Sequence, residues 1–201
     1  MNKIISEFGN IDVYLFDQIL KGRVKPNRKI LDAGCGGGRN LFYFLKNGFE
    51  CYGVDQNELA ILKTKELSQN LSPNLPQENF CLESVERMSF TNNSFQFVIS
   101  NAVLHFAKNE SHFEKMLFEM WRVLDFGGIL FVRLASDIGI ESLVKPLGDK
   151  IFLLPDGSTR FLVTQEMLLD CTQKLNATLL DPIKTTNVQN LRCMTTWVLQ
   201  K

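Results

Sequence analysis

Ile30-Leu31-Asp32-Ala33-Gly34-Cys35-Gly36-Gly37-Gly38-Arg39-Asn40 is the most informative stretch of this chain. The apolar run before Asp32 predicts a strand, and the apolar residues from Asn40 to Leu45 predict the first turns of a helix. Four of the five residues at 34–38 are glycine, which permits a tight turn with bare backbone. A strand, a glycine turn and a helix N-terminus in this order indicate a ligand-binding edge of an α/β sheet.

The spacing of the glycines separates two classes of cofactor. The dinucleotide fingerprint Gly-x-Gly-x-x-Gly would require glycine at 39 or 41, where the chain has Arg39 and Leu41. Instead, Asp32 is followed by glycine at every second position up to Gly38. This pattern resembles the first motif of class I S-adenosylmethionine (SAM)-dependent methyltransferases. The resemblance implies a Rossmann-like, doubly wound α/β sheet of seven strands with an antiparallel last strand.

The chemistry of SAM matches these residues. SAM carries no phosphate, and its inner end is an amino acid beside a sulfonium. The carboxylate of Asp32 suits the ammonium group, and backbone N–H groups near Gly36 and Gly38 suit the carboxylate. The alternative is a β–α turn that binds nothing. Four glycines cost backbone entropy that a simple connection does not require.

A second carboxylate, Asp55, ends the next predicted strand, twenty-three residues beyond Asp32. Nucleotide-binding α/β folds place an acid that contacts ribose at an offset of about 20 residues. We therefore expect Asp55 to accept hydrogen bonds from ribose hydroxyls, which SAM and NAD both possess. As an alternative, Asp55 caps the following helix, but Asn57 is the better N-cap.

The segment after the third predicted strand, Phe80 to Glu83, resembles the family's Gly-Asp-Ala-x-x-Leu-Pro-Phe, aligned through Phe90. The resemblance places Ser84 where an acid usually meets the adenine amino group, and Val85 where a backbone N–H meets the ring. Because serine replaces the acid, Glu83 or Glu86 stays open as the partner of the adenine.

The fourth predicted strand ends at Asn101-Ala102-Val103-Leu104-His105-Phe106, which resembles the family's segment beneath the sulfonium. His105 is the candidate catalytic proton acceptor, for an acceptor that arrives protonated; a packed helix residue is the alternative. His112 is expected at the surface, and Arg160 is expected to be a solvated turn residue or a contact for an anionic acceptor. The predicted cofactor site comprises Asp32, Gly34, Cys35, Gly36, Gly38, Arg39, Asn40, Asp55, Gln56, Ser84, Val85 and Asn101.

The remaining chain predicts a single domain over residues 1–201. Helical periodicity over 11–20 predicts an amphipathic helix, within an N-terminal cap over 1–28. Weakly helical sequence over 138–148 and a hairpin turning at Pro155-Asp156-Gly157 form the lid expected at 136–163, which the resemblance assigns to the acceptor pocket. Thr164 is the expected N-cap of a helix through Leu175, and two final strands around 177–181 and 191–199 are expected to pair antiparallel.

Composition restricts the partners. Lys plus Arg and Asp plus Glu number 22 each, so nothing in the net charge favours a polyanion, and no nucleic-acid partner is expected. No signal peptide or apolar stretch of about 20 residues is visible, which predicts a cytoplasmic protein without membrane association. The five cysteines are scattered without metal-ligand spacing, so reduced thiols and no metal are expected. A homodimer stays open.

Three functions remain at this stage. A SAM-dependent methyltransferase acting on a small-molecule acceptor is favoured by the glycine spacing and Asp55. Within this class, the length and the motif Gly36-Gly37-Gly38-Arg39-Asn40 resemble the tellurite-resistance subgroup. A non-catalytic SAM-binding module is the first alternative, because no acid–base machinery is evident. A nicotinamide-dependent oxidoreductase is the second, and Arg39 and Leu41 argue against it.

Overall fold

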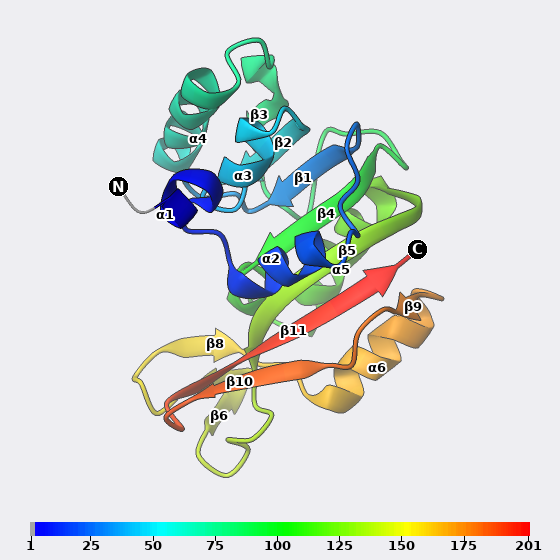
Figure 1. Cartoon of the computed structure of the whole chain (residues 1–201). Helices are drawn as coiled ribbons and strands as arrows, with labels where there is room; N and C mark the ends of the chain where they lie inside the picture. Colours follow the sequence, from blue (N-terminus) through cyan, green and yellow to red (C-terminus); the bar gives the residue numbers. More distant parts are fainter. Residues whose placement is uncertain (1–2) are drawn as a thin grey trace.

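The computed structural model describes residues 3–201, and a mostly parallel sheet organises it (Figure 1). The strand order is β10-β11-β5-β4-β1-β2-β3, with β9 also paired to β11. Strand β11 runs antiparallel to β5, and β10 antiparallel to β11, whereas β1 to β5 pair in parallel. The strands are β1 (Lys29–Ala33), β2 (Glu50–Asp55), β3 (Phe80–Leu82), β4 (Phe95–Asn101), β5 (Leu124–Ser136), β9 (Thr178–Leu179), β10 (Lys184–Val188) and β11 (Arg192–Gln200). The predicted fold class is confirmed.

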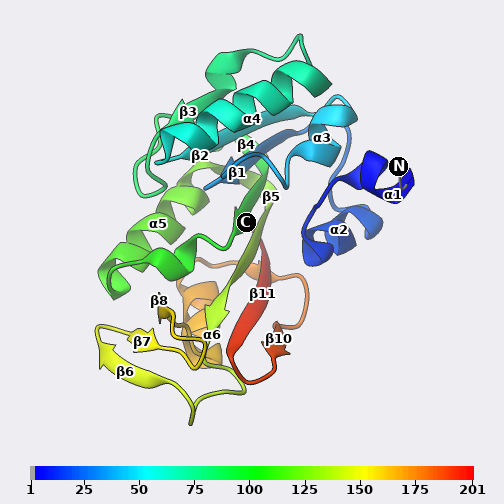
Figure 2. The same cartoon turned by 90° about the vertical axis from the view of Figure 1, so that its left-hand side faces the viewer.

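Helices cover both faces of this sheet (Figure 2). One face packs against Leu15, Phe44 and Ile61, which come from α2, α3 and α4. The other face packs against Phe113 and Met120 of α5 and against α6. The helices are α1 (Lys3–Phe8), α2 (Val13–Leu20), α3 (Phe42–Lys46), α4 (Glu58–Leu71), α5 (Glu110–Val123) and α6 (Gln165–Lys174), with short 3-10 turns η1 (Gln77–Asn79) and η2 (Leu104–Phe106). None of these helices in residues 3–201 has the length and apolar character needed to cross a bilayer.

The strand order places a crevice beside β1. From β1 the chain continues outward to β2 and β3, and then returns to the other side of β1 as β4. At such a reversal the loops leaving β1 and β4 turn to opposite faces, so their carboxyl ends are left open. The glycine turn after β1 and the segment after Asn101 therefore meet at the same edge.

A second, three-stranded sheet lies at the end of the molecule away from α4 (Figures 1 and 2). Its strands are β6 (Lys145–Gly148), β7 (Ile151–Leu153) and β8 (Thr159–Phe161), all antiparallel. The hairpin predicted at Pro155-Asp156-Gly157 is confirmed, because β7 and β8 flank it. Residues 138–148, which are weakly helical in sequence and interrupted by Pro146, form turns and the strand β6 and no helix. Pro146 lacks an N–H and cannot continue a helix, but it is tolerated on the edge strand β6.

Several predicted boundaries also differ from the structure. The strand expected at 177–181 contributes only the two-residue β9, and β10 forms the outer antiparallel edge instead. A helix not expected from the sequence, α1, precedes α2. Met1 and Asn2, at the start of the expected N-terminal cap, lie outside the described residues. The predicted N-caps Asn57 and Thr164 are confirmed, since their side chains accept the N–H groups of Ala60 and Met167.

Candidate functional site

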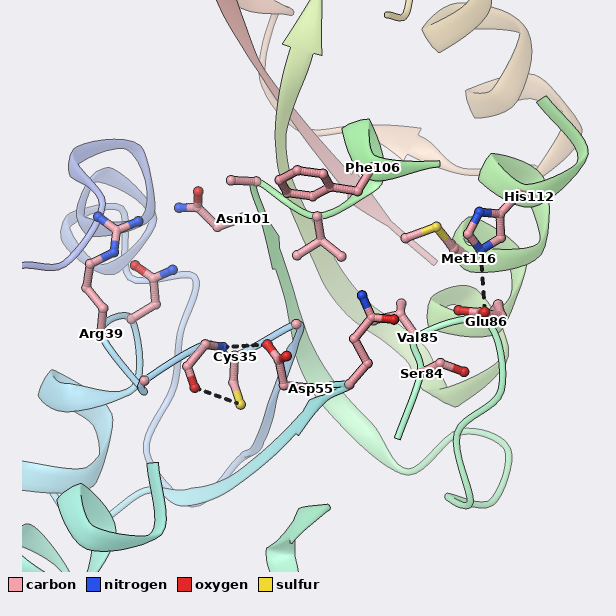
Figure 3. Close-up of a pocket in the computed structure, with 17 residues that line it drawn as sticks. Cys35, Arg39, Asp55, Ser84, Val85, Glu86, Asn101, Phe106, His112 and Met116 are labelled. Atoms are coloured by element: carbon pink, nitrogen blue, oxygen red, sulfur yellow. Dashed lines mark hydrogen bonds and ion pairs between the residues drawn. The ribbon is translucent and has the colours of Figure 1, made fainter. Parts of the chain in front are cut away.

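A cavity of about 520 Å³ opens at the carboxyl ends of β1, β2 and β4. Figure 3 shows the glycine turn, Arg39 and Asn101 on one side of it and His112, Met116 and Glu86 on the other. The cavity is lined by Gly34, Cys35, Gly36, Gly37, Arg39, Asn40, Asp55, Gln56, Ser84, Val85, Glu86, Asn101, Ala102, Val103, Phe106, His112 and Met116. Ten of the thirteen predicted site residues are in this wall; Asp32, Gly38 and His105 are not.

The glycine turn needs residues without a side chain for two different reasons. Gly34 has a φ of +86°, and a Cβ there would lie 2.4 Å from Val103 Cγ2, so this glycine lets the segment after β4 approach the turn. Gly38 has a φ of +78°, and a Cβ would lie 2.9 Å from Leu67 Cδ2 of α4. Gly36 has no neighbour within 4 Å of its Cβ position, so its backbone faces open space in the cavity wall.

Asp32 is buried behind this wall, at 1% exposure. Neither carboxyl oxygen has a hydrogen-bond partner within residues 3–201. Burial raises the pKa of this carboxyl to about 8, against the opposing charge of Arg39. A buried acid without a partner is costly. A cationic group entering here would relieve that cost and stabilise the ionised carboxylate.

Asn101, at the end of β4, is the second buried polar group without a partner. Its side chain is in the cavity wall, and its amide nitrogen and oxygen both lack hydrogen-bond partners in the part of the chain that the structure describes. An amide offers a donor and an acceptor together. Asp32 and Asn101 therefore present the hydrogen-bonding groups that the ammonium and carboxylate of an amino acid require.

Asp55 lies at the end of β2 and holds the glycine turn in place. Its Oδ2 accepts the Gly36 N–H at 2.8 Å (Figure 3). Its Oδ1 accepts the Asn57 N–H at 2.9 Å. Each carboxylate oxygen has a further lone pair, so two hydrogen bonds leave capacity for a ligand. Gln56 follows it in the wall.

Cys35 is a structural thiol in this geometry. It is 5% exposed, and burial raises its thiol pKa above the usual range. Its Sγ lies 3.8 Å from Thr64 Oγ1 and has no basic partner among the contacts of the described residues. The neutral thiol is the form present, which does not favour a nucleophile.

Arg39 and Asn40 connect the glycine turn to the N-terminal segment. Arg39 Nη1 donates to the carbonyl of Asn10 at 3.2 Å, and Asn40 Oδ1 accepts the Asp12 N–H at 3.1 Å. Asp12 in turn N-caps α2. The N-terminal helices are thus joined to the cavity wall through residues that also face the cavity.

The far side of the cavity contains His112 and Glu86, which the sequence did not predict to pair. His112 was expected at the surface, but it lines the cavity, with its Nε2 3.4 Å from Glu86 Oε1. Its Nδ1 accepts the Lys108 N–H at 3.1 Å, so neutral His112 carries its hydrogen on Nε2 and donates toward Glu86. The only sequence signal was Glu86 as an open partner of the adenine. Ser84 and Val85 lie beside this pair in the wall.

His105 is buried behind the cavity wall, to which its neighbour Phe106 contributes. It is 6% exposed, and its Nδ1 accepts the Ala135 N–H at 3.1 Å. Burial, and next the charge of Arg160, lowers its pKa to about 4. The neutral imidazole carries its hydrogen on Nε2, so a proton-acceptor role requires that His105 give up the bond to Ala135. That role stays a prediction.

Comparison with known proteins identifies what this arrangement is similar to. A family model described as "Methyltransferase domain" matches residues 31–132, just over half of the chain. The chain is 30% identical over 125 residues to the uncharacterized methyltransferase YodH of Bacillus subtilis (strain 168), which covers 62% of this chain and 48% of that protein. This chain spans about half the length of the curated relatives it matches.

Solved structures share the fold over almost the whole chain. A SAM-dependent methyltransferase of Methanosarcina mazei matches with a TM-score of 0.71 at 22% identity, covering 91% of this chain and 96% of that one. The 1,6-didemethyltoxoflavin-N1-methyltransferase of Burkholderia thailandensis, solved with 1,6-didemethyltoxoflavin and S-adenosylhomocysteine, matches with a TM-score of 0.72 at 16% identity, covering 99% and 81%. Because both identities are below 25%, these two matches show a shared fold and no more.

Proposed function

The chain belongs to the class I SAM-dependent methyltransferases, and from this premise we propose that it transfers a methyl group from SAM to a small-molecule acceptor by in-line displacement. The observation that carries the proposal is the buried carboxyl of Asp32, which has no partner within residues 3–201 and lies beside the glycine turn. An amino-acid ammonium is the complement of that group. SAM, the cofactor of this family, supplies an activated methyl group on a sulfonium when bound.

The residues of the cavity fit this cofactor. We assign the ammonium to Asp32, which is buried behind the cavity wall, the carboxylate to the Asn101 amide and the ribose hydroxyls to Asp55. The Gly36 N–H, which the sequence offered to the carboxylate, is already donated to Asp55. Ser84 and Val85 are assigned to the adenine end. A volume of about 520 Å³ is within the range of small-molecule and cofactor sites.

The chain's own contribution to the reaction is to position the reactants and exclude water. Alignment of an acceptor with the reacting carbon can supply roughly 7–11 kcal/mol of the barrier. The apolar residues Val103, Phe106 and Met116 line the cavity and offer an acceptor an apolar surface. His105 stays the proposed proton acceptor for an acceptor that arrives protonated.

We also propose the organisation and setting of the protein. The two N-terminal helices form a cap within residues 1–28, and the three-stranded sheet within 136–163 forms the acceptor lid of a single domain over 1–201. A small-molecule acceptor is supported by the likeness to the Burkholderia thailandensis enzyme, whose structure holds such a molecule. The cytoplasm is the proposed compartment, and neutral net charge supports the absence of a nucleic-acid partner. A homodimer and the tellurite-resistance subgroup stay predictions.

Thermal unfolding with S-adenosylhomocysteine tests the cofactor, with NADH as the alternative ligand. At a hundred times its dissociation constant a ligand adds about 2.7 kcal/mol, or roughly 5–10 °C for a domain of this size. We expect this shift with S-adenosylhomocysteine alone and its loss in Asp55→Ala. Asp170→Ala, on the exposed side of α6, is the matched control and should retain the shift. A shift with NADH alone, or with neither ligand, contradicts the proposal.

Methyl transfer is then measured as S-adenosylhomocysteine formed from SAM in the presence of a small-molecule library. Formation that depends on an added acceptor supports the enzyme. Cofactor binding without any such formation favours the non-catalytic module instead.

A further inference from the structure

An exposed aromatic ring closes the end of the cavity beyond Asn101. Phe106 lines the cavity and is 59% exposed, which is unusual for a phenylalanine on a short turn next to the buried Leu104 and His105. The guanidinium carbon of Arg160, on β8, lies 5.0 Å from the centre of this ring. Arg160 of the three-stranded sheet thus contacts the cavity wall through a cation–π interaction with Phe106.

Arg160 has no carboxylate within ion-pair distance among residues 3–201. Its guanidinium makes one hydrogen bond within the described part of the chain, from Nη1 to the carbonyl of the neighbouring Thr159 at 2.7 Å. The nearest acid along the hairpin, Asp156, is hydrogen-bonded to Ser158 and paired with Arg192 at 3.7 Å. Most of the guanidinium donors are therefore available to a ligand.

Two other arginines near this region, Arg133 and Arg39, already have partners within the protein. Arg133 is paired with Asp12 at 3.2 Å, so its charge is already compensated. Arg39 belongs to the glycine turn, donates to Asn10 and acts on Asp32. Among these three arginines, Arg160 lies against the Phe106 ring and has no ion pair in residues 3–201; Asp156 acts on it only at longer range.

Carboxylates of the cavity wall lie away from this end. Asp55 is the last residue of β2, and Glu86 is paired with His112. The wall that includes Phe106 also contains the apolar residues Ala102, Val103 and Met116. An apolar surface beside a cation that has no ion pair suits a ligand with a flat apolar body and an anionic group.

We propose that the methyl acceptor is a planar, apolar molecule carrying a carboxylate, with its body against Phe106 and its carboxylate on Arg160. This inference rests on the proposed function, because it places the acceptor in the same cavity as the cofactor. Arg160 acts as a specificity-determining residue and takes no part in bond making. In the reaction, the bond from sulfur to the methyl carbon breaks, its electron pair returns to sulfur, and the acceptor's lone pair forms the new bond.

Matched acid and amide pairs test the inference. The protein, saturated with S-adenosylhomocysteine, is titrated by NMR or calorimetry with benzoate, salicylate, indole-3-acetate and nicotinate, and with the primary amide of each. We expect at least one acid to bind more than tenfold tighter than its amide, since a charge-assisted contact is lost in the amide. Arg160→Gln should remove this preference. The control Arg28→Gln, an exposed arginine before β1, should retain it.

The outcomes separate this inference from the proposed function. If S-adenosylhomocysteine fails to bind the wild-type protein, the proposed function fails. If the wild-type protein and Arg160→Gln bind S-adenosylhomocysteine equally well, the variant is folded. The ratio of acid to amide affinity then tests the inference. Equal binding of acids and amides, no binding of any acid, or a preference that survives in Arg160→Gln would overturn the inference.

Discussion

The Asp32 carboxyl, buried in β1, is the residue that we expect to make ligand binding depend on pH. Its pKa is about 8 because burial disfavours the charged form, so at pH 7 the carboxyl is mostly protonated before a ligand binds. An ammonium placed beside it stabilises the ionised form. We predict that binding of S-adenosylhomocysteine at pH 7 releases close to one proton, and that Asp32→Asn releases none and binds about 10- to 100-fold more weakly.

Calorimetry in two buffers of different ionisation enthalpy measures this release. The same residue affects stability without ligand: the folded pKa is above the unfolded value of 3.8, so protonation favours the native state. Stability should fall as pH rises from about 4 to 8, by at most about 1.4 kcal/mol per pH unit, and Asp32→Asn should flatten this slope. Equal proton release by both proteins would show that Asp32 is not the group involved.

At the scale of elements, the glycine turn and α4 fit together through Gly38. We predict that Gly38→Ala destabilises the protein by about 1–3 kcal/mol, because φ is +78° and the new Cβ would meet Leu67 at 2.9 Å. Gly37 is the matched control, since its Cβ would have no neighbour closer than 3.7 Å. Gly37→Ala should change stability by less than about 0.5 kcal/mol in urea unfolding. Similar losses in the two variants would disprove the packing explanation.

Helix α2 is fixed to the sheet through Asp12, which is 6% exposed. Its Oδ1 accepts the Tyr14 N–H at 2.9 Å, and its Oδ2 pairs with Arg133 on β5 at 3.2 Å. Asp12→Ala removes the cap and leaves Arg133 without a counter-ion, for an expected cost of about 2–4 kcal/mol. Asp12→Asn keeps the cap and should cost less. Thermal unfolding of both variants measures the difference, and equal costs would assign the effect to the ion pair with Arg133 alone.

At the scale of the whole molecule, Asp181 joins segments about 160 residues apart. It accepts hydrogen bonds from Gln18, Lys21 and Arg23, which follow one another along α2 and the next loop. Burial acts to raise the pKa of Asp181, but these hydrogen bonds outweigh it and hold the pKa well below its usual range. The stabilisation is therefore present above about pH 4 and is lost as pH falls further.

We predict that Asp181→Asn lowers the free energy of unfolding by about 1–3 kcal/mol at pH 7, and by progressively less as pH falls below about 4. Lys184→Gln is the control, because its exposed contact with Asp17 spans 3.9 Å and should contribute little. Chemical unfolding across pH measures both variants. A loss in Asp181→Asn that does not change with pH would contradict the ionic explanation.

The sequence by itself determined the features that depend on local chemistry. The strand, glycine turn and helix at 29–46, the caps at Asn57 and Thr164 and the turn at Pro155-Asp156-Gly157 are all fixed by residues a few positions apart. Hydrogen bonds from a side chain to nearby backbone, and glycine's freedom at positive φ, do not require the rest of the fold. The offset between Asp32 and Asp55 was also predictable from the sequence, because one strand–helix–strand unit uses about that many residues.

Only the tertiary structure decided which side chains face the cavity. Phe106 lines it while His105, one residue earlier, is buried against Ala135, because the short turn η2 packs on β5. His112 of α5 enters the wall opposite Glu86. Arg160 of β8 reaches Phe106 because Val163, just after β8, bridges to Ser136 at the end of β5. These directions depend on contacts between elements distant in sequence. Composition and periodicity contain no information about them.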